Sequence, residues 1–214
     1  SHSNTKTREQ TYRMKNILMG IFLLTITTSC TMKNSNEAVA VISTKFGDIV
    51  VEFYDEVAPK HAESFKLHVE NGYFDGSIFH RVIPGFVIQG GDPNSKSEDR
   101  SKHGMGGHAA NYFGIGDEAD STSWMLPAEF NDTLHTRGML SMARSQNPDS
   151  GGSQFFICVA DVHQLDHQYT VFGKVIQGME FVDMIVNLPR DGRDNPNERV
   201  EMTAKMSTKG EALD

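Results

Sequence analysis

Cysteine, long apolar runs and clusters of basic residues are all scarce in this sequence of 214 residues. Its two cysteines, Cys30 and Cys158, cannot supply the disulfide framework that holds many small secreted domains together. No apolar run reaches the roughly 20 residues that a helix needs to cross a bilayer core, which argues against a permanent membrane span. The formal net charge is -8 and no lysine or arginine run occurs, so nothing indicates a nucleic-acid partner or an anionic membrane surface.

The remaining composition fits one soluble, folded domain. Hydrophobic residues make up 38% of the chain and charged residues 22%, which argues against disorder over the whole length. Removing a targeting segment of about thirty residues would leave a chain of the size of one ordinary domain with one hydrophobic core.

The N-terminal part has the form of a bacterial export signal. Residues 14–16 give a positive start, residues 17–24 a short apolar stretch, and small polar residues then lead to Cys30. Residues 27–30 resemble a lipobox, in which cleavage before the cysteine leaves a thiol for lipid attachment, although leucine usually stands where Thr27 does. We therefore predict a signal peptide over residues 14–30 and lipid attachment at Cys30, on the periplasmic side of a bacterial cell envelope. An unacylated signal, giving a soluble periplasmic or secreted protein, is the alternative.

The segments on either side of this signal are polar. We interpret residues 1–13 as a cloning remnant or as an upstream start that was assigned wrongly. Residues 31–37 are small and polar, which is typical of a tether. A single folded domain is expected over residues 38–208, followed by a C-terminal tail at residues 209–214.

The pattern of the domain is mainly that of short strands. Residues 38–43 and 49–54 flank a turn at residues 45–48 and predict a hairpin. Further strands are expected at residues 78–89, 138–143, 154–160, 170–176 and 200–207.

Two helices interrupt these strands. One is expected to begin at Pro59 and to end at Asn71-Gly72, and the other runs from Met179 to a stop at Pro189. Many strands with two isolated helices indicate a β-barrel or sandwich whose open ends are covered by helices.

Residues 94–123 are rich in Gly, Ser, Asp and His and have little periodicity, so they predict a long surface excursion between strands. Within it, His103 and His108 could bind a metal, but two histidines without a fixed third ligand are a weak pattern, and we predict no metal site. We interpret Cys158 as a small buried apolar residue, because no paired base is apparent near it in the sequence.

Two longer runs carry the most specific signal. Residues 79–92 are FHRVIPGFVIQGGD and residues 150–157 are SGGSQFFI. Both closely resemble the signature of the cyclophilin family of peptidyl-prolyl cis/trans isomerases. The resemblance continues, in the same order and at compatible spacings, through residues 128–131, 135–144, 165–166 and 171–175. It covers essentially residues 38–207.

The resemblance implies a mainly β fold, namely a cyclophilin-like eight-stranded antiparallel β-barrel capped by two α-helices, with the substrate groove on the outer face of the barrel. It implies no metal and no organic cofactor. Proline-containing peptides and unfolded exported proteins are the expected partners of a monomeric enzyme, which would contact the membrane only through its lipid anchor. By its position, Arg81 matches the catalytic arginine, and Gln89 is expected to hold Arg81 in place.

The other groove residues divide into two sets. The residues that match the family's groove are Phe86, Ala143, Gln154, Phe156 and Leu165. The substrate-binding positions that differ from the best-known members are Val87, Arg144, Gln164 and Tyr169, which stand in place of methionine, asparagine, tryptophan and histidine. These differences leave the isomerase centre intact but bear on peptide preference.

Strand alternation separates the neighbours of these residues from the groove. It turns His80 to the opposite face from Arg81 and places Phe155 in the core.

Three functions follow from these patterns. The first is an isomerase that speeds proline-limited folding of exported proteins. The second is a non-catalytic module that binds proline-containing peptides, and the third is an envelope holdase or assembly factor that works through residues 94–123. The pair of Arg81 and Gln89 favours the enzyme, because a simple binder needs the apolar pocket but no donor aimed at the prolyl nitrogen.

Overall fold

The computed structural model describes residues 35–214. They divide into two units, of which one is residues 38–207 and the other consists of residues 35–37 and 208–214. The predicted signal peptide, the lipid-attachment residue Cys30 and most of the tether lie outside the described residues. Within residues 35–214, no helix combines the length and the apolar character that crossing a membrane requires.

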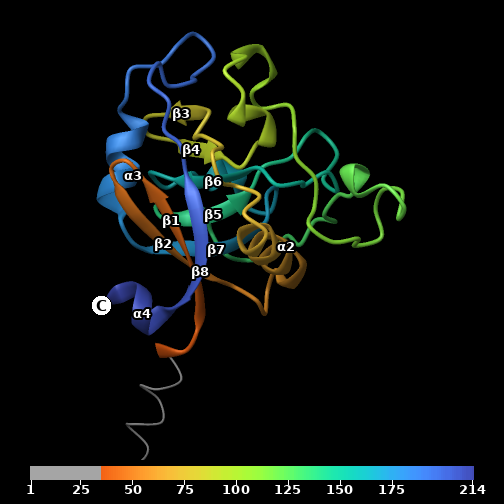
Figure 1. Ribbon diagram of the computed structural model, residues 1–214. Coiled ribbons are helices and arrows are strands. Elements are labelled where there is room, and N and C mark those ends of the chain that lie inside the picture. Colours follow the sequence, from red (N-terminus) through yellow and green to blue (C-terminus); the bar gives the residue numbers. More distant parts are fainter. Residues whose placement is uncertain (1–34) are drawn as a thin grey trace, which may run out of the picture. The chain divides into compact units, whose positions relative to one another are not determined.

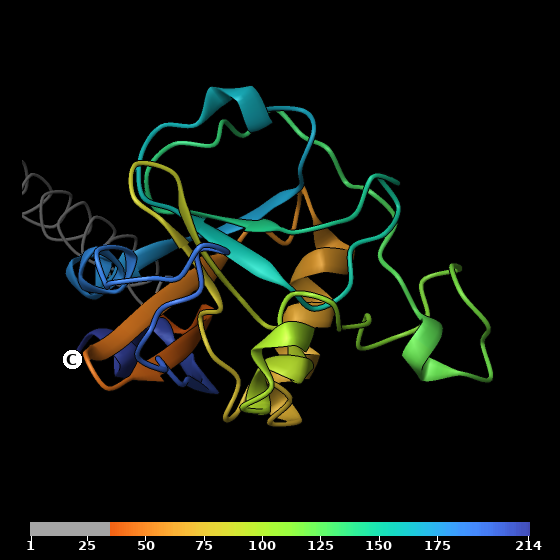
Figure 2. The same ribbon diagram turned by 90° about the horizontal axis from the view of Figure 1, so that it is seen from above.

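Eight strands form one sheet (Figures 1 and 2). They are β1 (Ala38–Thr44), β2 (Gly47–Phe53), β3 (Arg81–Ile83), β4 (Val87–Gly90), β5 (Met139–Met142), β6 (Phe155–Cys158), β7 (Val171–Gln177) and β8 (Thr203–Thr208). Their order across the sheet is β3-β4-β6-β5-β7-β2-β1-β8, with antiparallel pairing.

The sheet curls until the segments that lead into its two edge strands meet. The backbone N–H of Phe79 donates to Val200 O at 3.1 Å, and that of Met202 donates to Ser77 O at 2.9 Å. These bonds satisfy backbone groups that an open sheet edge would leave unpaired.

Two helices lie to either side of the strands in the view of Figure 1, and both contribute side chains to the same hydrophobic core. They are α2 (Pro59–Glu70) and α3 (Met179–Val186), and both agree with the predicted bounds. The N-cap residue of α2, Ala58, has no side chain that can cap the helix. Glu129, from a loop distant in sequence, caps it instead: its carboxylate accepts from Lys60 N at 3.1 Å and from His61 N at 3.0 Å. The predicted eight-stranded antiparallel β fold with two covering helices is confirmed.

The second unit contains a short helix, α4 (Lys209–Leu213), in the segment that the sequence indicated only as a tail. Thr208 caps it by accepting from Glu211 N at 3.3 Å. The backbone N–H of Lys209 donates to Glu37 O at 2.8 Å.

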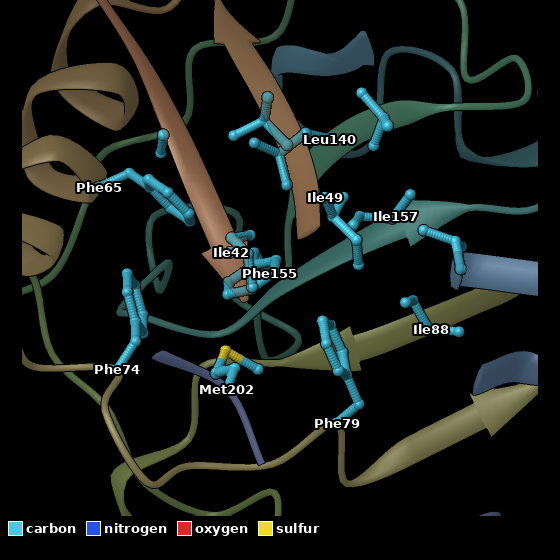
Figure 3. Packing of buried hydrophobic residues seen from close by; sticks show 14 of the residues in the cluster. Ile42, Ile49, Phe65, Phe74, Phe79, Ile88, Leu140, Phe155, Ile157 and Met202 are labelled. Atoms are coloured by element: carbon cyan, nitrogen blue, oxygen red, sulfur yellow. The ribbon is translucent and has the colours of Figure 1, made fainter. Parts of the chain in front are cut away.

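Aromatic side chains fill the interior of the curled sheet (Figure 3). Phe65 of α2 meets Phe155 of β6 edge-on, with 5.2 Å between the ring centroids, and lies 5.0 Å from Phe74. Offset and edge-on contacts of this kind stabilise a core beyond the area that they bury. The prediction that Phe155 belongs to the core is therefore confirmed.

One predicted strand is wrong. Residues 78–89 do not form a single strand but a hairpin of β3 and β4. The chain turns at Pro84-Gly85, where Gly85 adopts a φ of +73° that glycine accommodates without steric cost. The hairpin places Arg81 opposite Gln89 across the two strands.

The excursion predicted at residues 94–123 contains no strand and projects from the sheet, as Figure 2 shows for its green part. It holds three turns of 3-10 helix, η1 (Pro93–Lys96), η2 (Arg100–Lys102) and η3 (Ser121–Ser123). The residue before each turn is an aspartate, whose side chain accepts a hydrogen bond from the backbone N–H two residues later.

Candidate active site

A cavity of about 270 Å³ opens on the face of β4 and β6 that points away from the main core. Along β6, Phe155 and Ile157 belong to the main core, whereas Phe156 and Cys158 belong to a second apolar cluster under the cavity. The residues that line the cavity are Arg81, Phe86, Val87, Gln89, Ala143, Arg144, Phe156, Leu165 and Tyr169. The structure thus brings together most of the site residues that the sequence predicted.

Aromatic and aliphatic side chains form the floor of this cavity. Phe156 is buried, and the Tyr169 ring stands edge-on to it with 5.7 Å between centroids. Val87 is buried in the same cluster, and Phe86 and Leu165 pack against it. This part of the cavity suits a small apolar ring.

One side of the cavity carries its polar groups. Arg81 donates from Nη1 to Gln89 Oε1 at 3.3 Å, and Gln89 donates from Nε2 to Gln154 Oε1 at 3.0 Å. Gln154 itself lines an adjoining cavity of about 300 Å³, which shares Gln89, Ala143 and Arg144 with the first. This contact is the one that the predicted role of Gln89, to hold Arg81 in place, requires.

Arg144 closes the cavity beside Tyr169. Its guanidinium carbon lies 4.6 Å from the centroid of the Tyr169 ring, within the range of a cation-π contact. The same guanidinium donates twice to Gln168 O, from Nε at 3.0 Å and from Nη2 at 2.7 Å. Arg144 therefore holds the Tyr169 wall by a stacking contact and by two hydrogen bonds.

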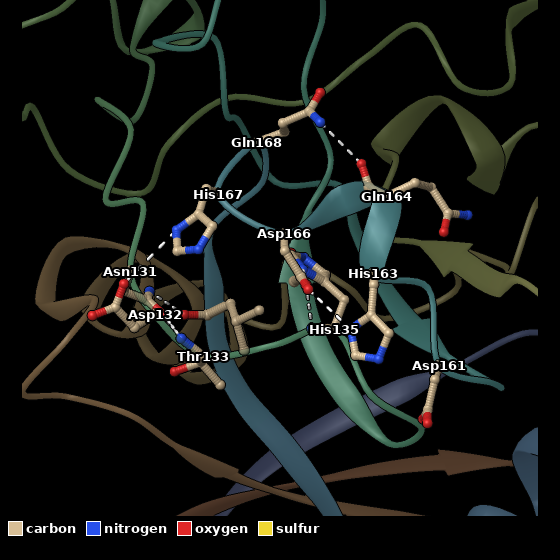
Figure 4. A network of polar contacts seen from close by, with 12 residues as sticks. Asn131, Asp132, Thr133, His135, Asp161, His163, Gln164, Asp166, His167 and Gln168 are labelled. Atoms are coloured by element: carbon tan, nitrogen blue, oxygen red, sulfur yellow. Dashed lines mark hydrogen bonds and ion pairs between the residues drawn. The ribbon is translucent and has the colours of Figure 1, made fainter.

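Asp166 belongs to the segment that supplies Leu165 and Tyr169, and it forms part of the polar network in Figure 4. Asp166 Oδ1 accepts from His135 N at 2.7 Å and lies 3.0 Å from His135 Nδ1, and Oδ2 lies 2.9 Å from His163 Nδ1. The backbone hydrogen bond from His135 is the largest cause that lowers the pKa of Asp166, to about 2. Asp166 thus ties the segment that carries the wall of the cavity to His135.

Gln164 is a predicted site residue that lines neither this cavity nor the adjoining one. It lies in η4 (His163–Leu165), and in Figure 4 its side chain points away from Asp166 and Gln168. It is absent from the lining of the cavity, while its neighbour Leu165 is part of it.

His80 and Cys158 have no exposed reactive group. His80 is buried, its two ring nitrogens lack a hydrogen-bond partner, and burial lowers its pKa to about 4, so the ring is neutral at pH 7. Burial likewise raises the pKa of the Cys158 thiol to about 12, which makes it a poor nucleophile. The interpretation of Cys158 as a small buried residue is confirmed.

Residues 104–107 line the adjoining cavity, which the sequence did not assign. The signal that could have indicated them is the run Gly104-Met105-Gly106-Gly107, because glycines crowded into a loop allow a backbone to come close to neighbouring groups. Asp92, at the end of the longest motif, was also not recognised as a contact of this loop.

Comparisons with known proteins agree on one family. Residues 39–206 match the family model described as "Cyclophilin type peptidyl-prolyl cis-trans isomerase/CLD". A probable peptidyl-prolyl cis-trans isomerase of Brucella abortus is 39% identical over 180 residues, covering 81% of this chain and 85% of the relative. A peptidyl-prolyl cis-trans isomerase of Acinetobacter baylyi is 42% identical over 153 residues, covering 69% of this chain and 71% of the relative.

A solved structure shows the same fold. The crystal structure of a cyclophilin-type isomerase from Cryptosporidium parvum, determined in the presence of the dipeptide Ala-Pro, superposes with a TM-score of 0.66 at 31% identity and covers 79% of this chain and 98% of its own. Together with the matched family model, these similarities show that the chain belongs to the cyclophilin-type family of peptidyl-prolyl cis-trans isomerases.

Proposed function

We propose that Arg81 accelerates rotation about Xaa-Pro peptide bonds by donating a hydrogen bond to the prolyl nitrogen, while the apolar floor of the cavity holds the proline ring. A peptide bond resists rotation by roughly 18 to 20 kcal/mol, because the nitrogen lone pair is delocalised into the carbonyl group. Rotation breaks this conjugation and leaves the lone pair on a pyramidal, more basic nitrogen. A donor aimed at that nitrogen therefore binds the twisted state better than the planar ground state.

Arg81 suits this task because its guanidinium stays charged and presents several donors in one plane. The contact with Gln89 Oε1 uses Nη1 and leaves other N–H groups for the substrate. No proton has to be transferred, so neither the neutral His80 nor the buried Cys158 is needed as a base or nucleophile. An acceleration of about 10⁵ would require roughly 7 kcal/mol of preferential stabilisation of the transition state.

The apolar floor supplies the second requirement, a fixed end for the rotating bond. Phe156 and Leu165 lie in the same cavity as Arg81, so a proline ring packed against them would place its nitrogen on the Arg81 side. If one end of the bond is held while the other end turns, part of the binding energy serves to orient the prolyl nitrogen relative to Arg81. This juxtaposition of Arg81 with the apolar floor carries the proposal, and the Ala-Pro dipeptide present with the Cryptosporidium relative supports a proline-containing peptide as the ligand.

Arg81→Ala tests the role of Arg81 directly. Loss of the donor should lower kcat/KM for an Xaa-Pro peptide by about 10²- to 10³-fold, the usual cost of removing one donor to a transition state. Arg81→Lys should restore little, because an ammonium group lacks the planar fork. NMR exchange between the cis and trans peptide gives the rates without a coupling protease.

Arg190→Ala is the matched control, because Arg190 is an exposed arginine paired with Asp194 outside the cavity, at 3.2 Å. It should keep the wild-type rate. Near-wild-type turnover of folded Arg81→Ala would remove Arg81 from the mechanism. If the unmodified chain bound the peptide but did not isomerise it, the non-catalytic binding module would be favoured.

We also propose that exported proteins are the substrates and that the enzyme is anchored to a bacterial envelope by lipid on Cys30. The export-signal pattern of residues 14–30 supports this. Cys30→Ala should shift the protein to the soluble periplasmic fraction or block its processing, whereas Cys158→Ala should leave it in the membrane fraction. Wild-type membrane retention and processing of Cys30→Ala would contradict lipid attachment.

A further inference from the structure

The buried side chain of Asp92 organises the loop that follows β4. Asp92 is 0% exposed, and its Oδ1 accepts from Asn94 N at 2.9 Å and from Gly106 N at 3.2 Å. Its Oδ2 accepts from Gly104 N. A carboxylate only accepts hydrogen bonds, so backbone N–H groups match it fully. One side chain thus fixes the path of residues 104–106.

The loop lies so close to its neighbours that side chains would not fit. A Cβ at Gly106 would come within 2.6 Å of Asp92 Oδ1 and 2.8 Å of Asn94 Nδ2. A Cβ at Gly107 would collide with Ser153 Oγ, and the φ of Gly107 is +113°. The carbonyl group of Gly106 is therefore held between two close contacts.

This carbonyl is the start of a chain of hydrogen bonds that ends at Arg81. Gly106 O accepts from Gln154 Nε2 at 2.8 Å. Gln154 Oε1 accepts from Gln89 Nε2 at 3.0 Å, and Gln89 Oε1 accepts from Arg81 Nη1 at 3.3 Å. The two glutamines link the loop to the guanidinium without any interruption.

The direction of this chain is fixed at both ends. Gly106 O can only accept, so Gln154 must present its NH₂ group to it and its oxygen to Gln89. Gln89 must then present its own oxygen to Arg81, which can only donate. If Gly106 O were displaced, Gln154 Nε2 would lose its acceptor, and Gln154 and Gln89 would be held from the Arg81 end alone.

We propose that Asp92 is a positioning residue for the isomerase: by fixing Gly106 O it sets the orientation of Gln154 and Gln89, and through them the aim of Arg81. This inference rests on the proposed role of Arg81. Asp92 is buried and does not line the cavity, so a peptide bound there would not contact it. Its effect should therefore appear in kcat, while the apolar floor, and with it KM, is left intact.

Asp92→Asn is the first test, because an NH₂ group would replace an oxygen that faces backbone N–H donors. We expect kcat for an Xaa-Pro peptide to fall at least about tenfold, with KM changed by less than about twofold. In ¹⁵N NMR spectra, the Nε–H signal of Arg81 should shift and exchange faster with water. In a Gln154→Ala background, where the chain is already cut, Asp92→Asn should lower kcat by less than about twofold further.

A second variant keeps the buried charge. Gly106→Ala would push the loop backbone away from Asp92 and should show the same fall in kcat and the same change at Arg81 Nε–H. The control for Asp92→Asn is Asp99→Asn, because Asp99 caps η2 in the same excursion by accepting from Ser101 N at 3.1 Å. The control for Gly106→Ala is Gly192→Ala, because a Cβ added at Gly192 meets nothing within 4 Å. Both controls should keep the wild-type kcat and Arg81 signal.

The inference is overturned if Asp92→Asn and Gly106→Ala, measured at a temperature where both are folded, keep a wild-type kcat and Arg81 signal. Lower thermal stability with an unchanged kcat would overturn it too, since Asp92 would then only anchor the loop. Arg81→Ala separates this failure from that of the proposed function, because an active Arg81→Ala variant contradicts the mechanism itself, whatever the Asp92 variants show.

Discussion

His135 shows how one buried side chain can support a binding surface that it does not reach. Its side chain is 0% exposed, and its ring stacks on that of Phe156 with 6.0 Å between centroids and an interplanar angle of 19°. Burial is the largest cause that lowers its pKa, so the ring is neutral near pH 7. Since the Asp166 carboxylate can only accept, the proton sits on Nδ1, and Nε2 faces Ser141 Oγ at 3.0 Å.

His135→Ala should lower both the stability of the domain and its affinity for substrate. The change leaves a cavity behind Phe156 and removes two buried hydrogen bonds, so we expect the free energy of unfolding to fall by about 2 to 4 kcal/mol. KM for a proline-containing peptide should rise, because Phe156 and the segment carrying Leu165 lose their support. Urea denaturation and peptide kinetics measure the two effects.

His163→Ala is the matched control, because His163 faces the same Asp166 carboxylate but its side chain is 55% exposed. An exposed pair of this kind contributes less than about 1 kcal/mol. Equal losses of stability in the two variants would show that the buried side of the network has no special weight.

At the scale of elements, the β3–β4 hairpin marks a limit of periodicity. Residues 78–89 are rich in strand-forming residues on both sides of Pro84-Gly85, so the run resembles one strand, although the Pro-Gly pair is itself a turn signal. The pairing of Arg81 with Gln89 depends on this turn. Periodicity identified the residue types here, but the turn decides which of them face one another.

The loop after β4 marks another limit. Asp92 meets Gly104 and Gly106, which lie more than ten residues further along the chain, and it faces them only after the excursion has folded back. Hydrogen bonds between backbone and side chain across such a loop leave no periodic pattern in the sequence. Asp92 itself ends a matched motif, but its partners Gly104 and Gly106 lie outside the motifs, so its contact was not predicted. Phe156 and Leu165 were predicted because they match groove positions of the family.

At the scale of the whole molecule, the fold was the most predictable feature, because strand and helix patterns and the family resemblance all indicated the same architecture. Burial also lowers the pKa of individual histidines, which none of these patterns indicates. His68 and His80 both lie inside the domain, and burial is the largest cause that lowers the pKa of each to about 4. His68 Nε2 donates to His108 O at 2.8 Å and its ring lies 3.9 Å from that of Tyr73, so it is held as a neutral ring.

These two histidines predict that the domain loses stability in mild acid. In the unfolded chain each ring takes up a proton near pH 6.5, whereas the folded rings do so only near pH 4. The unfolded chain therefore binds more protons than the folded chain over this window. The free energy of unfolding falls as the pH drops, by at most about 3 kcal/mol per histidine. The carboxylates with lowered pKa, such as Asp166, act in a separate window, because their stabilisation is lost only below about pH 4.

His68→Gln tests this prediction, since glutamine can keep the hydrogen bond to His108 O but cannot take up a proton. The slope of the free energy of unfolding between pH 7 and pH 5, measured by urea denaturation, should fall by roughly a third to a half, because His80 and His135, whose pKa values burial also lowers, remain. His163→Gln, at an exposed position, should leave the slope unchanged. A wild-type free energy of unfolding that stays level from pH 7 to pH 5 would contradict the prediction.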